Sequence, residues 1–423
     1  MITKFKIAIF CLSIFLTAPC ILVQAVQTVS PEQVGMSSQR LQRLDKVLTE
    51  YVEEGKLPGA AALIARRGKI TYLKSFGMMD IDENKKMQKD TMFRIASMSK
   101  PITSVAVMML YEEGNFLLTD PISKFIPEFK NPKVIQIDPD TKEEKLVPAR
   151  REITIRHLLN HTSGITYGDG PQAKYYEKAG LTVGLTPTEG TIEQMIKKLG
   201  GLPLISHPGE EFHYGMSVDV LGYLVEVISG MSFDEFLKER IFTPLQMNDT
   251  YMVLPEDKLP RLAKTYRYIN GRMEESPIDL SYLTTQTYFS GGAGLVSTPA
   301  DYLRFAQMML NEGKLGDVRI LSRKTVELMT SNSIGDLHIW DSFEHNGIMG
   351  DKFGYGFGIR TERGKYDQIE SLGMYGWDGA FYTRFWIDPK EELIGIFMSQ
   401  VDNYWQETLI GKFRVLTYQA IDD

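Results

Sequence analysis

The sequence predicts an α/β (α+β) protein whose antiparallel sheet is formed by both ends of the chain, with a mainly helical region inserted between them. Short β-forming runs separated by turn residues lie at 57–80 and again at 350–400. Between them, over roughly 97–310, apolar residues recur at helical spacing. Residues 26–423 are therefore expected to form a single domain.

The amino-terminal elements follow from local patterns. Apolar residues recur every three or four positions between 41 and 51, after Ser37 and Ser38, which predicts a helix. The apolar runs 60–65 and 69–74 flank an Arg-Arg-Gly turn and predict a β-hairpin. Residues 138–150 are charged and contain prolines, which favours a surface excursion.

The middle of the chain reads as helices, and its end returns to strands. Helical periodicity covers 102–113, 155–159, 192–199, 218–229, 233–241 and 300–310. Strands are expected over 355–361, 381–387 and 393–399, followed by an amphipathic helix over 405–419. These late strands are the ones expected to complete the sheet begun by the early hairpin.

Composition excludes several classes of protein. The chain has 423 residues, of which 43% are hydrophobic and 24% charged, and this balance excludes disorder for the bulk of it. The formal net charge of −7 is spread along the chain, so the basic patch of a nucleic-acid-binding protein is missing and no nucleic-acid partner is expected. The oligomeric state is left open.

Residues 1–25 have the order of a secretory signal peptide. Lys4 and Lys6 precede an apolar run over 7–23, and Val23-Gln24-Ala25 provides a small-residue cleavage site. We therefore expect export to the periplasm or the medium, with an uncleaved membrane anchor as the alternative. Both cysteines, Cys11 and Cys20, fall inside this segment. Disulfides and cysteine-based sites are excluded for 26–423, and neither a cofactor nor a metal is expected.

The segment 93–101, FRIASMSKP, contains the Ser-x-x-Lys pattern of Ser97 and Lys100. Residues three apart on a helix share a face, so the Lys100 ammonium can lie beside the Ser97 hydroxyl. A serine is a poor nucleophile unless an adjacent base takes its proton. The spacing alone is weak, because one such pattern is expected by chance in a chain of this length.

Several motifs in one order make the pattern specific. They are FRIASMSK at 93–100, HLLNHTSG at 157–164, Tyr214 followed by DVLG at 219–222, and GGAGLVST at 291–298. With them the chain resembles the serine β-lactamase and penicillin-recognising superfamily, most closely its class C-like branch and the family VIII carboxylesterases. The resemblance implies a β-lactamase/transpeptidase-like fold, an acyl-enzyme on Ser97, and Lys100 with Tyr214 as the general acid/base pair.

The resemblance leaves two questions about Tyr214. A phenol titrates near about 10, so Tyr214 acts as a base at neutral pH only if a cation such as Lys100 favours the phenolate. Which of the two is the formal base stays open, because groups this close titrate as a pair. Met216 stands where the superfamily often has an asparagine that contacts an amide, which puts amide substrates in doubt.

The segment 375–380, YGWDGA, stands where β-lactamases and cell-wall peptidases have Lys-Thr-Gly, and it resembles the Trp-Gly-Gly of the esterases. The resemblance implies that Tyr375, Trp377, Asp378 and Gly379 contact substrate and that the Ala380 N–H joins that of Ser97 as the oxyanion hole. An acid at Asp378 would repel anionic substrates. The alternative for this segment is an exposed turn.

Other candidates have plainer interpretations. His157 and His161 lie four apart, but no acid lies between them, so packing is favoured over metal binding. Gly291 to Gly294 is expected to form a tight turn beside the cleft, because no phosphate-loop lysine follows. Tyr167 and Phe289 are either an aromatic wall for an acyl group or ordinary core residues.

These observations predict an exported serine hydrolase that cleaves small carboxylic esters through an acyl-enzyme. The partner is then a small-molecule ester or amide. A β-lactamase or D-amino-acid peptidase using the same residues is the first alternative. The second is a non-catalytic relative that binds the cell wall or a partner protein, although such a protein has no need of Ser97, Lys100 and Tyr214 together.

Overall fold

The computed structural model describes residues 26–423 except 183–184, 186–187, 277, 280, 286, 340–350, 363–368 and 403–407. The expected signal peptide at 1–25 and the first turn of the expected last helix, 405–407, therefore lie outside the described residues. No helix among the described residues is both long and apolar enough to cross a membrane.

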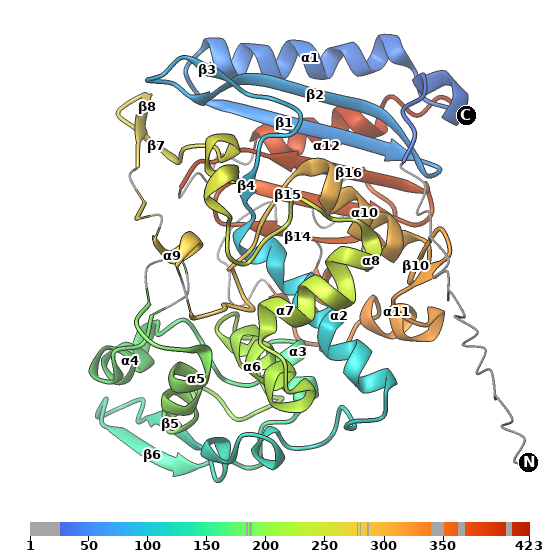
Figure 1. Ribbon diagram of the computed structural model, residues 1–423. Helices are drawn as coiled ribbons and strands as arrows, with labels where there is room; N and C mark the ends of the chain where they lie inside the picture. The colour runs from blue at the N-terminus through green and yellow to red at the C-terminus, as the bar shows by residue number, and fades with distance from the viewer. Residues whose placement is uncertain are drawn as a thin grey trace, which may run out of the picture.

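An eight-stranded antiparallel sheet forms the centre of the molecule, as expected (Figure 1). Its order is β12-β13-β14-β15-β16-β1-β2-β3, so strands from the two ends of the chain meet where β16 pairs with β1. The bounds are β1 (Gly59–Arg66), β2 (Lys69–Asp80), β3 (Lys85–Lys86), β12 (Lys352–Phe353), β13 (Gly358–Ile359), β14 (Tyr375–Gly379), β15 (Thr383–Asp388) and β16 (Leu393–Met398).

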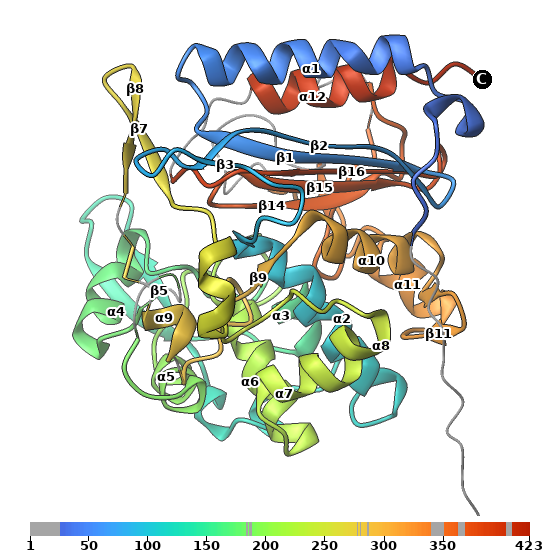
Figure 2. The same ribbon diagram turned by 45° about the horizontal axis from the view of Figure 1, so that its top comes forward.

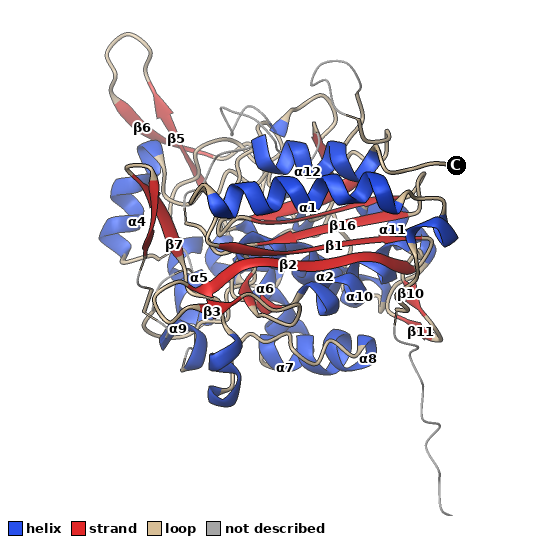
Figure 3. Ribbon diagram, turned by 90° about the horizontal axis from the view of Figure 1, so that it is seen from above, coloured by secondary structure: helices blue, strands red, loops and turns tan. Residues whose placement is uncertain are grey.

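Two helices from opposite ends of the chain cover one face of this sheet. They are α1 (Ser38–Glu53) and α12 (Thr408–Tyr418), which lie side by side over the sheet and run roughly along its strands (Figures 2 and 3). The apolar stripe predicted for α1 is buried against the strands. On α12, Phe413 packs on Trp386 of β15 with ring centroids 5.4 Å apart. Side chains that alternate with Trp386 along β15 therefore point to the other face.

The inserted helical region covers the second face (Figure 1). Its central helix α2 is buried along nearly its whole length, which explains why its sequence has no polar stripe. The helices are α2 (Ser99–Glu112), α3 (Ile155–Leu159), α4 (Ala173–Ala179), α5 (Ile192–Gly200), α6 (Ser217–Ser229), α7 (Phe233–Leu237), α8 (Thr243–Leu245), α9 (Ser281–Thr284), α10 (Pro299–Leu310) and α11 (Arg323–Met329).

Among the described residues, four small hairpins or strand pairs lie outside the main sheet. They are β4 (Phe93–Arg94) with β9 (Val296–Ser297), β5 (Lys133–Ile137) with β6 (Glu144–Pro148), β7 (Tyr266–Ile269) with β8 (Arg272–Glu275), and β10 (Lys314–Leu315) with β11 (Val318–Arg319). The pair β4–β9 matters for function, because it joins the segment before Ser97 to the glycine-rich segment that ends at Gly294.

Some expected elements differ in extent. The strand expected over 355–361 is paired only at 358–359, where positive-φ Gly356 has just turned the chain. The excursion at 138–150 contributes to the exposed β5–β6 hairpin. The helix expected over 233–241 is α-helical only to Leu237 and then continues as a π-helix.

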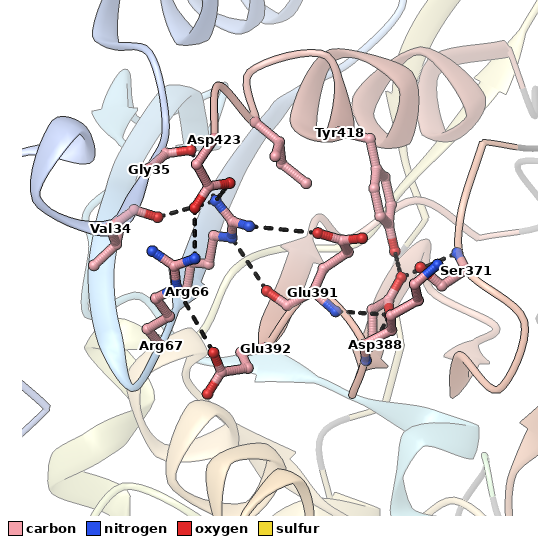
Figure 4. A network of polar contacts seen from close by, with 12 residues as sticks. Val34, Gly35, Arg66, Arg67, Ser371, Asp388, Glu391, Glu392, Tyr418 and Asp423 are labelled. Carbon is pink, nitrogen blue, oxygen red and sulfur yellow. Dashed lines mark hydrogen bonds and ion pairs between the residues drawn. The ribbon is translucent and has the colours of Figure 1, made fainter.

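A polar network joins residues 34–35 and the C-terminal residue to the end of β1, a central strand of the sheet (Figure 4). Arg66 at the end of β1 is buried, and its guanidinium donates to the carbonyls of Val34 (3.0 Å) and Gly35 (2.8 Å) and to the Asp423 carboxylate (2.8 Å). Nearby, the Tyr418 hydroxyl of α12 donates to Asp388 at 2.7 Å. Each buried polar group of this cluster thereby gains partners that offset its desolvation.

Candidate active site

Ser97 and Lys100 lie at the start of α2. Ser97 belongs to the short 3-10 helix Ala96–Met98, and Lys100 is the second residue of α2. Lys100 Nζ lies 3.1 Å from Ser97 Oγ. Lys100 is fully buried while Ser97 remains partly exposed, so a substrate can reach the hydroxyl but not the amine. Ala96 just before Ser97 has φ 42°, an uncommon value for a residue with a side chain.

The Lys100 amine has two further hydrogen-bond partners. Nζ donates to the Tyr167 hydroxyl at 2.8 Å and to the Gly292 carbonyl at 2.9 Å. Burial lowers the pKa of Lys100 to about 7, although the Asp219 carboxylate acts to raise it. A substantial fraction of Lys100 is therefore neutral near pH 7, which is the form that can accept a proton.

Tyr214 completes the arrangement from the segment before α6. Lys100 Nζ lies 4.5 Å from the centroid of its ring, and the Trp377 indole Nε1 donates to its hydroxyl at 2.9 Å. Burial raises the pKa of Tyr214 above its ordinary value, while hydrogen bonds with Ser97 and Trp377 act to lower it. The phenol is thus protonated at neutral pH before substrate binds.

Aromatic rings fix the position of Tyr214. Its ring centroid lies 4.6 Å from that of His161, 5.7 Å from Tyr167 and 5.4 Å from Trp377. His161 is fully buried and also packs on Phe212 and Phe353. The other histidine of the pattern, His157, accepts the Thr154 N–H at 3.1 Å as part of a helix cap. Both histidines therefore pack or cap, and no group of acids, histidines or cysteines among the described residues has the arrangement of a metal site.

Strand β14 passes beside the nucleophile. It contacts the short helix that carries Ser97, and a side chain at Gly379 would collide with Thr383 and with the Ile95 carbonyl, whose carbon would lie only 3.1 Å from the added Cβ. Glycine is thus required for the approach. Ala380 follows the strand directly and is exposed, and its assignment as an oxyanion donor stays a prediction.

The strand geometry does not favour the predicted contact of Asp378 with substrate. Side chains alternate along β14, so Asp378 points to the opposite face from Trp377. There it pairs across the strands with Arg384 at 2.5 Å, on the face that α12 covers. Burial raises the pKa of Asp378, and the Arg384 charge opposes that rise. Asp378 is thus paired with Arg384 on the face of the sheet away from Ser97, and this position does not support the predicted contact with substrate.

The position of Tyr375 also does not support its predicted contact with substrate. It packs on Phe357 with centroids 5.3 Å apart and lines a cavity of about 830 Å³ between α10 and α11. Neither Ser97, Lys100 nor Tyr214 lines that cavity. Of the segment 375–380, the structure therefore brings Trp377 to Tyr214 and Gly379 to the segment before Ser97, and it places Tyr375 in a separate part of the core.

Sequence reasoning missed two contributors. The sequence predicts an acyl wall or a core position for Tyr167, yet Lys100 donates a hydrogen bond to its hydroxyl. Asp219 enters the sequence argument only as part of the DVLG motif, yet it is fully buried and its charge acts on Lys100. A signal for Asp219 was present, because it is the one acid in the otherwise apolar stretch VDVLGYLV at 218–225. No pattern links Tyr167 to Lys100, since they are 67 positions apart.

Comparisons with known proteins identify the family and the fold of the chain. The family model described as Beta-lactamase matches residues 44–416. Protein Rv1367c of Mycobacterium tuberculosis is 34% identical over 361 residues, covering 84% of this chain and 88% of that protein. Esterase EstB of Burkholderia gladioli is 31% identical over 285 residues, covering 62% of this chain and 68% of EstB. Among solved structures, EstCE1, a hydrolase with promiscuous acyltransferase activity, aligns with a TM-score of 0.78 at 25% identity, over 90% of this chain and 99% of EstCE1.

Proposed function

This chain belongs to the Beta-lactamase family and is a serine hydrolase, and from that premise we propose that it cleaves small neutral carboxylic esters. The observation that carries the proposal is the hydrogen bond from Trp377 Nε1 to the Tyr214 hydroxyl. In the peptidase and β-lactamase branches a lysine of Lys-Thr-Gly serves the substrate carboxylate. Here a neutral indole occupies that strand position, so the attraction for a carboxylate is lost while a donor to Tyr214 remains.

In the proposed reaction, Ser97 Oγ attacks the ester carbonyl and its proton passes to neutral Lys100, 3.1 Å away. The C–O bond to the alcohol then breaks as the Tyr214 phenol donates its proton to the leaving alkoxide, and the Lys100 ammonium returns the first proton to the Tyr214 phenolate. A water deprotonated by the same pair attacks the acyl-enzyme and releases the acid. The depressed pKa of Lys100 and the raised pKa of Tyr214 favour Lys100 as the group that takes the first proton.

Backbone donors would hold the developing oxyanion. The N–H of Ser97, at the start of α2, is one candidate, and the N–H of Ala380 is the other. The close approach of Gly379 to Ile95 supports this pairing, because it draws the end of β14 toward the nucleophile. We also propose export, on the strength of the signal-peptide pattern in residues 1–25.

A chromogenic panel tests the proposed substrate class. Purified protein is assayed with p-nitrophenyl butyrate, with nitrocefin and with a D-alanyl p-nitroanilide. We expect turnover of the butyrate ester to exceed that of the other two. Faster hydrolysis of nitrocefin or of the anilide would overturn the ester assignment while leaving the serine hydrolase in place.

Covalent labelling tests the nucleophile. Ser97→Ala should abolish labelling by a fluorophosphonate probe together with ester turnover. Ser104→Ala is the matched control, because Ser104 lies on the same helix, is fully buried, and its hydroxyl has no hydrogen-bond partner among the described residues. Labelling that survives in Ser97→Ala would move the nucleophile elsewhere.

A further inference from the structure

Asp219 is a buried acid that takes part in none of the proposed reaction steps. It lies in the first turn of α6 and is fully shielded from solvent. Its Oδ1 accepts three hydrogen bonds, from Ser290 Oγ at 2.6 Å, the Tyr288 hydroxyl at 3.2 Å and the Gly292 N–H at 3.4 Å. Burial raises the pKa of Asp219, while the hydrogen bonds from Ser290, Gly292 and Tyr288 and the charge of Lys100 act to lower it. The three donors on Oδ1 thus favour the ionised carboxylate against the effect of burial. A buried charge held in this way is costly unless another charge lies near it.

The second carboxylate oxygen of Asp219 is the unusual one. Oδ2 is buried and has no hydrogen-bond partner among the described residues. It lies against Gly292, because a Cβ added at Gly292 would be only 2.7 Å from Oδ2. Gly292 in turn presents its carbonyl to Lys100 Nζ at 2.9 Å. A single residue of backbone thus separates the carboxylate from the amine beside Ser97.

The surroundings of Lys100 contain few other charges. The groups that face it are Ser97 from the helix start, Tyr167 and His161 from the segment after α3, Tyr214 from the segment before α6, and the Gly292 carbonyl. Burial keeps His161 neutral by lowering its pKa, and the two tyrosines are neutral because burial raises theirs. Behind the sheet, Asp378 acts on Tyr214 but is paired with Arg384. Asp219 is therefore the acid whose charge acts on Lys100 from within the same buried cluster.

We propose that Asp219 is a positioning residue of the active site, which holds the 290–292 turn against Lys100 and supplies the buried negative charge that sets the pH range in which the Lys100–Tyr214 pair works. The inference rests on the proposed function, since it gives Lys100 and Tyr214 their roles. It adds a residue that touches neither Ser97 nor substrate. Its effect reaches the reaction through the Lys100 amine alone.

The experiment compares the pH dependence of Ser97 phosphonylation by a fluorophosphonate in the wild type and in Asp219→Asn. The asparagine has the same shape and can still accept from Ser290, but it has no charge. The carboxylate favours the ammonium form of Lys100, so its removal should lower the apparent pKa of the pair. We expect both limbs of the rate profile to move to lower pH by about one unit or more, whichever group carries the shared proton.

Ser290→Ala is the matched control, because it deletes the 2.6 Å hydrogen bond to Asp219 and keeps the charge. It is expected to slow labelling without moving the limbs by more than a few tenths of a unit. Limbs that stay in place in Asp219→Asn, or that move equally in Ser290→Ala, would overturn the proposal and leave Asp219 with a packing role. If Asp219→Asn does not fold, Asp219→Ser removes the charge without added bulk and carries the same expectation. A wild type that the probe does not label at Ser97 would instead refute the proposed function itself.

Discussion

Gly379→Ala is the most discriminating single change, because it tests how closely β14 approaches the nucleophile. The added methyl would lie 3.1 Å from the carbonyl carbon of Ile95 and closer still to its oxygen. Optimal carbon–carbon separation is about 3.5–4.0 Å, so the methyl is short of space by roughly 0.5 Å or more. The Thr383 hydroxyl can rotate away, but the backbone of Ile95, two residues before Ser97, cannot. The strand or the nucleophile segment must move.

Such a movement should cost more activity than stability. A displacement of roughly 1 Å in a catalytic geometry lowers rates by about 10²-fold, while overpacking of this size costs about 1–3 kcal/mol of unfolding free energy. We expect kcat for p-nitrophenyl butyrate to fall by about 10- to 100-fold. KM should change little, because the oxyanion contact strengthens in the transition state. Steady-state kinetics and urea unfolding of the same preparation separate the two effects.

Gly411→Ala is the control for Gly379→Ala. Gly411 lies in α12, on the far side of the sheet, and nothing lies within 4 Å of a Cβ built there. Alanine in a helix interior is favoured over glycine by about 1 kcal/mol, so this variant should gain some stability and keep full activity. If Gly379→Ala keeps kcat within twofold of the wild type, the end of β14 does not shape the oxyanion site, and the pairing of Ala380 with Ser97 is wrong.

Three further predictions concern the amine, the indole and the acid behind the sheet. Because burial lowers the pKa of Lys100 to about 7 and its neutral form accepts the proton, kcat/KM for a neutral ester should rise with pH through about 7; a profile flat from about pH 5 to 9 would contradict this. Trp377→Phe removes the donor to Tyr214 and should lower kcat/KM roughly three- to tenfold. Its control is Trp386→Phe, because Trp386 Nε1 has no hydrogen-bond partner among the described residues and its ring faces α12. An equal loss of rate in both variants would show that the hydrogen bond from Trp377 to Tyr214 does not matter for catalysis. Asp378→Asn should leave the ratio of succinate half-ester to butyrate ester turnover unchanged and cost roughly 1–3 kcal/mol of stability through Arg384, measured by urea unfolding. A raised ratio at low salt would restore Asp378 to the cleft.

The central sheet could be predicted because its long strands have clear local signals. The runs at 60–65, 69–74 and 393–399 are apolar and bounded by turns, and each corresponds to a paired strand. Strand β14 has no such signal, because Gly376, Asp378 and Gly379 interrupt the pattern of a buried strand. Only the resemblance of YGWDGA to a known motif placed it beside the nucleophile.

The site was predictable where chemistry follows from spacing and unpredictable where it follows from the tertiary fold. Ser97 and Lys100 are three residues apart, so helix geometry alone brings them together, as the 3.1 Å contact shows. The orientation of Asp378 depends on strand register, and a shift of one residue reverses the face to which a side chain points. The contact of Tyr167 with Lys100 depends on how the segment after α3 packs against α2, which no local pattern encodes.

The joining of β16 to β1 has a consequence for the newly made chain. During synthesis the nucleophile at Ser97 emerges long before β14, β15 and β16, which arrive some 280 residues later. At about 5–20 residues per second, that interval lasts from about 14 seconds to a minute. Strand β14 pairs with β13 and β15, and this group of strands joins the β1–β2 hairpin only through β16. Before β16 pairs with β1, the nascent chain therefore has its serine and lysine but no assembled catalytic centre. We therefore expect no hydrolytic activity from the nascent chain before strands β14 to β16 have been synthesised.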